Sequence, residues 1–189
     1  MYLIAVSETF KPVLRQSRAM VEVFHNQGNQ REIGRMNMLL EMERQFNLRN
    51  SNYFLNLLTN DDKVVRTRAI CILAEIAGEN SVEHIAKVLK NDLDPLVRHE
   101  AAFSLGQLGF TSAISALSGA VRSDQSFFVR HEAAIALGVI GSEEGREALK
   151  EALVDNSEEV RESANIALAN LDYVSLTNRN NEFSKMTGG

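Results

Sequence analysis

One pattern recurs four times along the sequence, and this repetition limits the possible folds more than any other feature. The copies begin at residues 64, 96, 128 and 159, and the third residue of each is an arginine: Arg66, Arg98, Arg130 and Arg161. Successive arginines stand 32, 32 and 31 residues apart, and a second amphipathic segment follows each of the first three copies. Helix–turn–helix units of roughly 30 to 45 residues are the signature of a stacked helical solenoid. The sequence therefore predicts an all-α protein built from helical hairpins.

The residues around the repeated segments are typical of helix ends. Glycines follow the first three copies, at Gly78, Gly109 and Gly141. Residues that commonly cap helices precede the second segments, at Ser81, Thr111 and Ser142. Glycine accepts the left-handed conformation that ends many helices, and serine or threonine oxygens accept hydrogen bonds from the first helical amides. Because no alternating β pattern of useful length occurs, residues 61–172 are expected to form four repeats of a HEAT-like α-solenoid.

The two ends of the chain depart from the repeat. Amphipathic helices are predicted over residues 10–24 and 31–46, with the polar residues 25–30 between them and a shorter helix over 52–58. Residues 1–60 are therefore expected to form an N-terminal helical extension that serves as a cap or an association region. Its methionines suit either core packing or a partner surface: Met36, Met38 and Met42. Residues 173–189 are mostly polar, so a flexible tail is expected there.

Composition and charge exclude several classes of protein. The net charge of −5 lacks the basic footprint of nucleic-acid binding. The first residues lack the basic region of a signal peptide, and no run of about 18 apolar residues could span a membrane. The single cysteine, Cys71, excludes an internal disulfide and suits a reducing compartment. We therefore expect a cytoplasmic protein that binds neither nucleic acid nor a membrane.

The second and third copies each carry a His-Glu pair directly after the arginine, His99-Glu100 and His131-Glu132. A rotation of about 100° per residue places these pairs opposite the apolar stripes of their helices. The stripes, which we expect to be buried, are Val97, Ala101, Leu105 and Leu108, and Val129, Ala133, Leu137 and Ile140. Further apolar residues share the side of the pairs: Phe103, Ile135 and Val139. A solvated face does not normally carry such residues, which suit a covered pocket or a dimer contact.

The spacing of the two pairs permits a shared metal ion. Neighbouring packed helices lie about 8 to 10 Å apart, and a metal–nitrogen bond adds about 2 Å to the reach of an imidazole. His99 and His131 can therefore bind one ion between them. Glu100 and Glu132 supply carboxylate ligands beside it. Two histidines and a carboxylate with open positions form the ligand set of non-haem Fe(II) oxygen chemistry, and zinc or manganese suits similar ligands.

The flanking repeats show that the fold does not require a His-Glu pair. Thr67-Arg68 and Glu162-Ser163 occupy the same positions in the first and fourth copies. The competing interpretation is that His-Glu is a surface feature copied when one repeat was duplicated.

The two central copies resemble one lobe of deoxyhypusine hydroxylase. The resemblance is carried by PLVRHEAAFSLGQLG, residues 95–109, and FVRHEAAIALGVIG, residues 128–141. That family consists of HEAT-repeat di-iron mono-oxygenases with two lobes of four repeats, and the middle two repeats of each lobe carry the His-Glu motifs. Residues 61–172 have the same arrangement, and a single such lobe is present.

The resemblance implies a role for each His-Glu residue. His99 and His131 would ligate one iron. Glu100 would reach across to the iron held by the opposing lobe, and Glu132, the expected catalytic acid, would contact substrate or bound oxygen species. Because one lobe cannot complete such a site, a second copy related by a two-fold axis is required. The expectation is a homodimer with two iron ions, dioxygen as co-substrate, and a small molecule or a protein side chain as substrate.

Two classes of function therefore stand side by side. The first is a non-haem di-iron hydroxylase or mono-oxygenase whose metal site uses the His-Glu motifs of two chains. The alternative is a non-catalytic HEAT-repeat scaffold that binds protein, or a chromophore-lyase-like protein, because relatives of the phycobilin lyases share much of the helix consensus.

The remaining candidate residues have structural interpretations. His25 and His84 are expected to be ordinary surface histidines, and Cys71 a small packing residue. The repeated arginines are expected to form a ladder with acidic residues such as Asp94, Asp124 or Glu158. The sequence contains no P-loop, GxGxxG, GxSxG, HExxH or CxxC motif, which leaves nucleotide binding, serine hydrolysis and zinc fingers without local support.

Overall fold

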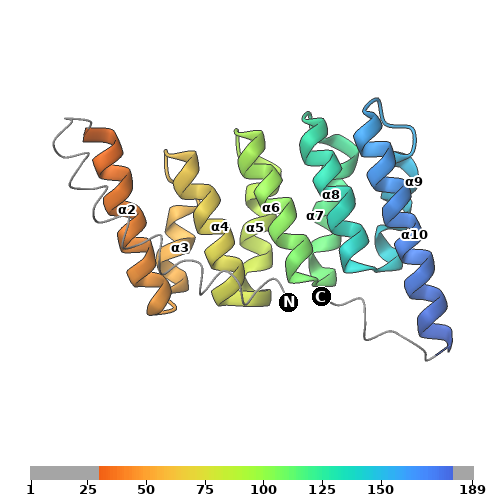
Figure 1. Ribbon diagram of the computed structural model, residues 1–189, viewed down its shortest axis with the longest axis horizontal. Coiled ribbons are helices and arrows are strands. Elements are labelled where there is room, and N and C mark those ends of the chain that lie inside the picture. Colours follow the sequence, from red (N-terminus) through yellow and green to blue (C-terminus); the bar gives the residue numbers. More distant parts are fainter. Residues whose placement is uncertain (1–29, 181–189) are drawn as a thin grey trace.

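The helices of the computed structural model, which describes residues 30–180, stand in two rows (Figure 1). One row contains α2 (Gln30–Asn47), α4 (Lys63–Ala77), α6 (Pro95–Leu108), α8 (Phe127–Ile140) and α10 (Glu158–Asn180). The row behind it contains α3 (Ser51–Leu57), α5 (Val82–Asn91), α7 (Ile114–Ser123) and α9 (Arg146–Ala152). Three short 3-10 turns lead into the second row, η1 (Gly78–Ser81), η2 (Thr111–Ala113) and η3 (Glu143–Gly145). Residues 30–180 contain no strand, and the prediction of an all-α solenoid of helical hairpins is confirmed.

The core lies between the two rows, where the predicted apolar stripes meet the second helices. The stripe residues Val97, Leu105 and Leu137 are almost completely inaccessible to solvent, whereas Leu108 and Ile140, at the ends of the stripes, are partly buried. Leu117 of α7 is fully buried on the other side of this core. Because each hairpin buries its apolar face against its neighbours, the stack forms one continuous core.

Short polar residues and glycines set the helix ends. The side chain of Asp94 accepts a hydrogen bond from the amide of Leu96, and Pro95 occupies the first turn of α6. Gly109 and Gly141 end α6 and α8 in the left-handed conformation, with φ of 72° and 69°. The predicted helix stops are therefore confirmed at these two positions.

The second helices begin differently from the prediction. Ser142 caps the turn η3, because its side chain accepts a hydrogen bond from the amide of Glu144. The hydroxyl of Ser81 instead donates to the carbonyl of Gly78, and Thr111 is the first residue of the turn η2. A 3-10 turn thus stands where a side-chain cap was expected, since such a turn can itself satisfy the amides at a helix start.

Close contacts between helices in the first row explain the Leu-Gly dipeptide of the repeat. A Cβ atom added to Gly106 would lie 2.8 Å from the Cβ of Ala136, and one added to Gly138 would lie 2.8 Å from that of Ala167. These distances are shorter than side chains tolerate, so glycine allows α6, α8 and α10 to approach one another. The face that carries the His-Glu pairs is built on these close contacts.

The repeated arginines form the expected ladder with partly different partners. Each of the first three uses two nitrogens to bind one carboxylate, in the pairs Arg66–Asp92, Arg98–Asp124 and Arg130–Asp155. In each of these arginines, and also in Arg161, Nη1 donates to a backbone carbonyl of the preceding loop. Of the suggested acids, only Asp124 takes part in a bidentate pair. Asp94 caps α6 and binds Lys63 instead.

The two ends of the described chain pack as continuations of the stack. Met42 is buried with Phe54, and Met38 packs against the same core, so these two methionines take part in core packing. The predicted helix over 10–24 and the histidine His25 lie outside the described residues. At the other end, α10 continues to Asn180, so residues 173–180 are helical rather than a loose tail. No glycine or proline occurs between residues 173 and 180 to stop the helix.

Candidate metal centre on the face of the first row

The His-Glu pairs lie in the first halves of α6 and α8, which stand side by side in the first row between α4 and α10 (Figure 1). Nε2 of His99 lies 3.3 Å from Oε2 of Glu132, so the histidine of one repeat contacts the acid of the next. The imidazole of His99 also stacks on the ring of Phe128, with centroids 4.0 Å apart and planes inclined by 10°. Glu132 is only 9% exposed. His99 and Glu132 are thus held in one orientation by α8.

His131 makes the equivalent contacts with α10. Its Nδ1 lies 2.7 Å from the hydroxyl of Ser163 and 3.3 Å from the carbonyl oxygen of Glu159. The hydroxyl of Ser163 lies 2.8 Å from the same carbonyl. Ser163 occupies the sequence position that Glu100 and Glu132 occupy in their repeats, so a hydroxyl replaces a carboxylate beside the second histidine.

Glu100 reaches in the opposite direction, toward α4. Its Oε1 accepts a hydrogen bond from the thiol of Cys71 at 2.9 Å. The pKa of the Cys71 thiol is raised, mainly because neighbouring atoms desolvate the sulfur and secondly because Glu100 is negatively charged. The residue as a whole nevertheless remains exposed. Cys71 is therefore a hydrogen-bond donor to Glu100 rather than a nucleophile at neutral pH.

The four predicted ligands consequently share one face without forming a closed metal site. The structure brings together His99 and Glu132, while His131 and Glu100 bind partners on α10 and α4. Within residues 30–180, no group of three or more His, Cys, Asp or Glu residues is arranged to hold a metal ion. Imidazole nitrogens and carboxylate oxygens are nonetheless donor types that suit iron.

Apolar residues surround the pairs as predicted. Phe103 is 44% exposed, Ile135 37% and Val139 55%. The structure adds Ile166 of α10, which is 70% exposed and occupies the same position of the repeat as Phe103 and Ile135. This row of side chains, which we call the apolar rim, extends across three successive helices of the first row.

Phe128 and Ser163 are not recognisable as site residues from the sequence alone. Phe128 precedes the buried stripe of α8, which gives no sign that its ring stacks on a histidine of α6. Ser163 is visible only as a departure from the His-Glu pattern in the fourth repeat. Its position in register with Glu132 is the one signal that could have indicated a contact with the preceding histidine.

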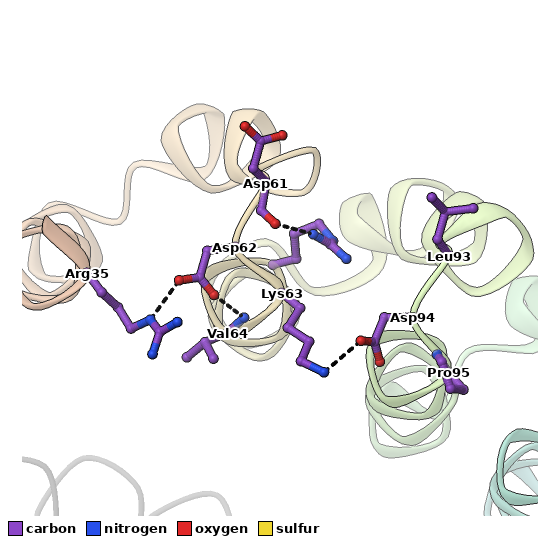
Figure 2. A pocket seen from close by; sticks show the side chains of 9 residues that line it. Arg35, Asp61, Asp62, Lys63, Val64, Leu93, Asp94 and Pro95 are labelled. Carbon is purple, nitrogen blue, oxygen red and sulfur yellow. Dashed lines mark hydrogen bonds and ion pairs between the residues drawn. The ribbon is translucent and has the colours of Figure 1, made fainter. Parts of the chain in front are cut away.

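A separate hollow lies along one edge of the stack, between the loops that precede α4 and α6 (Figure 2). It encloses about 460 Å³. Figure 2 shows two ion pairs in its lining: Arg35 binds Asp62 at 2.6 Å, and Lys63 binds Asp94 at 2.9 Å. None of the four predicted ligands lies there. These ion pairs connect neighbouring repeats and do not present a free charge to a ligand.

The fold described above agrees with the comparison with known families. The family model of HEAT repeats matches residues 82–169, which span α5 to α9 and part of α10. Within residues 30–180, no helix is both long enough and apolar enough to cross a membrane.

Among solved structures, the chain is similar to human deoxyhypusine hydroxylase in complex with glycerol. The two are 28% identical and superpose with a TM-score of 0.62, over 78% of this chain and 49% of the human protein. The chain thus spans about half the length of the structure it matches. No curated protein matches the sequence significantly. The structural similarity confirms the resemblance that the two His-Glu segments carry.

Proposed function

We propose that this chain is one half of a non-haem di-iron hydroxylase or mono-oxygenase, and that a second copy supplies the other half. The observation that carries the proposal is the placement of two His-Glu pairs on one face of a fold similar to half of human deoxyhypusine hydroxylase. A two-fold axis facing this surface would present the same donors twice, because an isologous interface pairs one patch with itself.

Each donor has a defined part in this proposal. His99 and His131 would supply imidazole nitrogens to one iron of the pair, and Glu100 would supply a carboxylate to the iron held by the other chain. Bound iron would supply the activation of dioxygen that protein side chains cannot provide. Glu132, whose Oε2 lies 3.3 Å from Nε2 of His99, would orient that ring and hold a proton beside the reacting centre.

The apolar rim supports a hydroxylase rather than a simple metal store. Phe103, Ile135 and Val139 are exposed in the single chain and would be covered by an opposing copy. Covered apolar side chains exclude water and can position a C–H bond of a substrate beside the metal. The substrate is accordingly expected to present an aliphatic carbon, on a small molecule or on a protein side chain.

Anaerobic titration with Fe(II) tests the metal-binding part of the proposal. His99→Ala and His131→Ala should each weaken iron binding at least tenfold while circular dichroism shows a retained helical fold, because each removes a ligand. His84→Ala is the matched control, since His84 lies on α5 in the other row. Binding that is equal in all four proteins, or absent from the parent, would contradict the proposal.

A second candidate is a scaffold that binds a partner protein through the same face. The exposed apolar rim favours it, since such a row is typical of protein contacts. Adding Fe(II) distinguishes the two candidate functions. A scaffold should bind its partner equally well with and without Fe(II). The enzyme should consume dioxygen when it is loaded with iron and supplied with a reductant. Loss of that consumption in Glu132→Gln would favour the enzyme.

A further inference from the structure

We propose that Ser163 is a positioning residue that fixes the proton of His131 on Nδ1 and so leaves Nε2 as the metal-binding nitrogen. The consequence for metal binding rests on the function proposed above. The effect on the proton does not, because it follows from contacts within the single chain.

The hydrogen-bond partners of His131 determine where its proton lies. The hydroxyl of Ser163 donates a hydrogen bond to the carbonyl of Glu159, 2.8 Å away. The oxygen of Ser163 then accepts from Nδ1 of His131 at 2.7 Å. Nδ1 also lies 3.3 Å from the Glu159 carbonyl, a contact that is attractive only when Nδ1 carries a hydrogen. In the neutral ring, Nε2 therefore holds the free electron pair.

Burial makes the hydroxyl difficult to replace. Ser163 is only 5% exposed, so a water molecule has little access to the position between the ring and the carbonyl. A ring nitrogen binds a metal when it lacks a hydrogen, and the hydrogen bond on the other nitrogen selects which one that is. Ser163 thus prepares His131 for ligation before any metal arrives.

The same position of the repeat prepares the two histidines differently. In α8 it is Glu132, whose carboxylate faces Nε2 of His99. In α10 it is Ser163, which faces Nδ1 of His131. Nε2 of His131 therefore stays available to a metal, whereas Nε2 of His99 is already in contact with a carboxylate. The structure assigns the first metal contact to His131 on this basis.

Nitrogen NMR of the full-length, metal-free protein tests the assignment. Long-range proton–nitrogen spectra at pH 8 distinguish the two neutral forms of each ring, and His131→Ala identifies the signals. The parent should show hydrogen on Nδ1 of His131, and Ser163→Ala should convert this to a mixture with the Nε2–H form. Ser104→Ala is the control, because Ser104 is also buried in the first row and occupies the position of Ala136 in the next repeat.

A second pair of variants covers the case in which Ser163→Ala perturbs packing. Ser163→Thr and Ser163→Val have the same shape, and only the first keeps a hydroxyl. The threonine variant should retain the parent tautomer, and the valine variant should lose it. Fe(II) affinity should fall about tenfold to a hundredfold in the alanine and valine variants and recover in the threonine variant.

The outcomes separate this proposal from the proposed function. An unchanged Nδ1–H signal in both Ser163→Ala and Ser163→Val would overturn the role of Ser163. A tautomer change in Ser163→Ala and Ser163→Val, together with a parent protein that binds no Fe(II), would support the positioning role and reject the metal function.

Discussion

At the scale of single residues, the same position of three successive repeats contacts the preceding helix through different chemistry. Glu100 accepts from the thiol of Cys71, Glu132 contacts the imidazole of His99, and Ser163 contacts that of His131. The acids and the hydroxyl are therefore part of a chain of contacts between repeats. Their roles can be tested one contact at a time.

The contact between Cys71 and Glu100 predicts a change in thiol reactivity. Replacing Glu100 by Gln removes the negative charge that helps to raise the pKa of the thiol, so more thiolate should form at pH 8. Alkylation by iodoacetamide should then be faster, by about threefold for each unit by which the pKa falls. Because Cys71 is the only cysteine in the chain, the rate reports on this residue alone.

Glu147→Gln provides the control for this experiment, because Glu147 is an exposed acid of α9. It should leave the alkylation rate unchanged. An equal rate for the parent and Glu100→Gln would show that the thiol does not respond to the carboxylate.

The positions of His99, Glu100, His131 and Glu132 on one face are predictable from the sequence, because helical periodicity alone decides the face. The partners of these residues are not. They lie 29 to 33 residues away, and small shifts between neighbouring helices decide whether a side chain meets a histidine, a thiol or a hydroxyl. That information enters only with the packing of the repeats.

At the scale of helices, substitution of the glycines between α6, α8 and α10 is expected to lower stability. Gly138→Ala would place a Cβ atom 2.8 Å from the Cβ of Ala167, so α8 and α10 would have to separate. We expect a loss of about 1 to 3 kcal/mol in the free energy of unfolding, measured by urea denaturation.

Gly119→Ala is the matched control for that substitution. Gly119 lies within α7, and a Cβ atom added there meets nothing within 4 Å. Alanine should therefore stabilise the helix by about 0.5 to 1 kcal/mol. If both variants changed stability in the same direction, the close approach of α8 and α10 would not explain the glycine at position 138.

The ion pair between Arg130 and Asp155 predicts a dependence of stability on pH. The hydrogen bond from Arg130 lowers the pKa of Asp155 below its ordinary value of 3.8. The folded state is thus stabilised while Asp155 is ionised, and this contribution is lost as the pH falls below about 4. Asp155→Asn should cost about 1 to 3 kcal/mol at pH 7.

Urea denaturation at pH 7 and pH 3 measures the effect. The difference in unfolding free energy between the parent and Asp155→Asn should shrink at pH 3, because Asp155 is then largely protonated in the unfolded chain and its ionisation in the folded state stabilises less. A difference that is the same at both values would mean that the ion pair contributes nothing through its charge.

The order and number of the repeat helices follow from sequence periodicity, helix-stop glycines and the repeated arginine. The 3-10 turns and the true acidic partners of the ladder do not. Asp92 and Asp155 are chosen by the path of the loop after each second helix, whereas the sequence alone equally suggests Asp94 and Glu158. The helical continuation of α10 to Asn180 is not predicted by the sequence, because a polar composition is equally typical of a loose chain end.

At the scale of the whole molecule, the chain corresponds to about half of the enzyme it resembles. It covers 49% of human deoxyhypusine hydroxylase, and its described residues carry two His-Glu pairs beside an exposed apolar rim. A second copy facing this surface would account for both features. The central claim is therefore that the His-Glu face functions only when two copies meet.

Native mass spectrometry of the full-length protein after anaerobic loading with Fe(II) tests this claim most directly. The account predicts a dimer that carries two iron ions, and a His131→Ala variant that folds and loses the iron. A parent protein that remains a monomer without iron under the same conditions would contradict it.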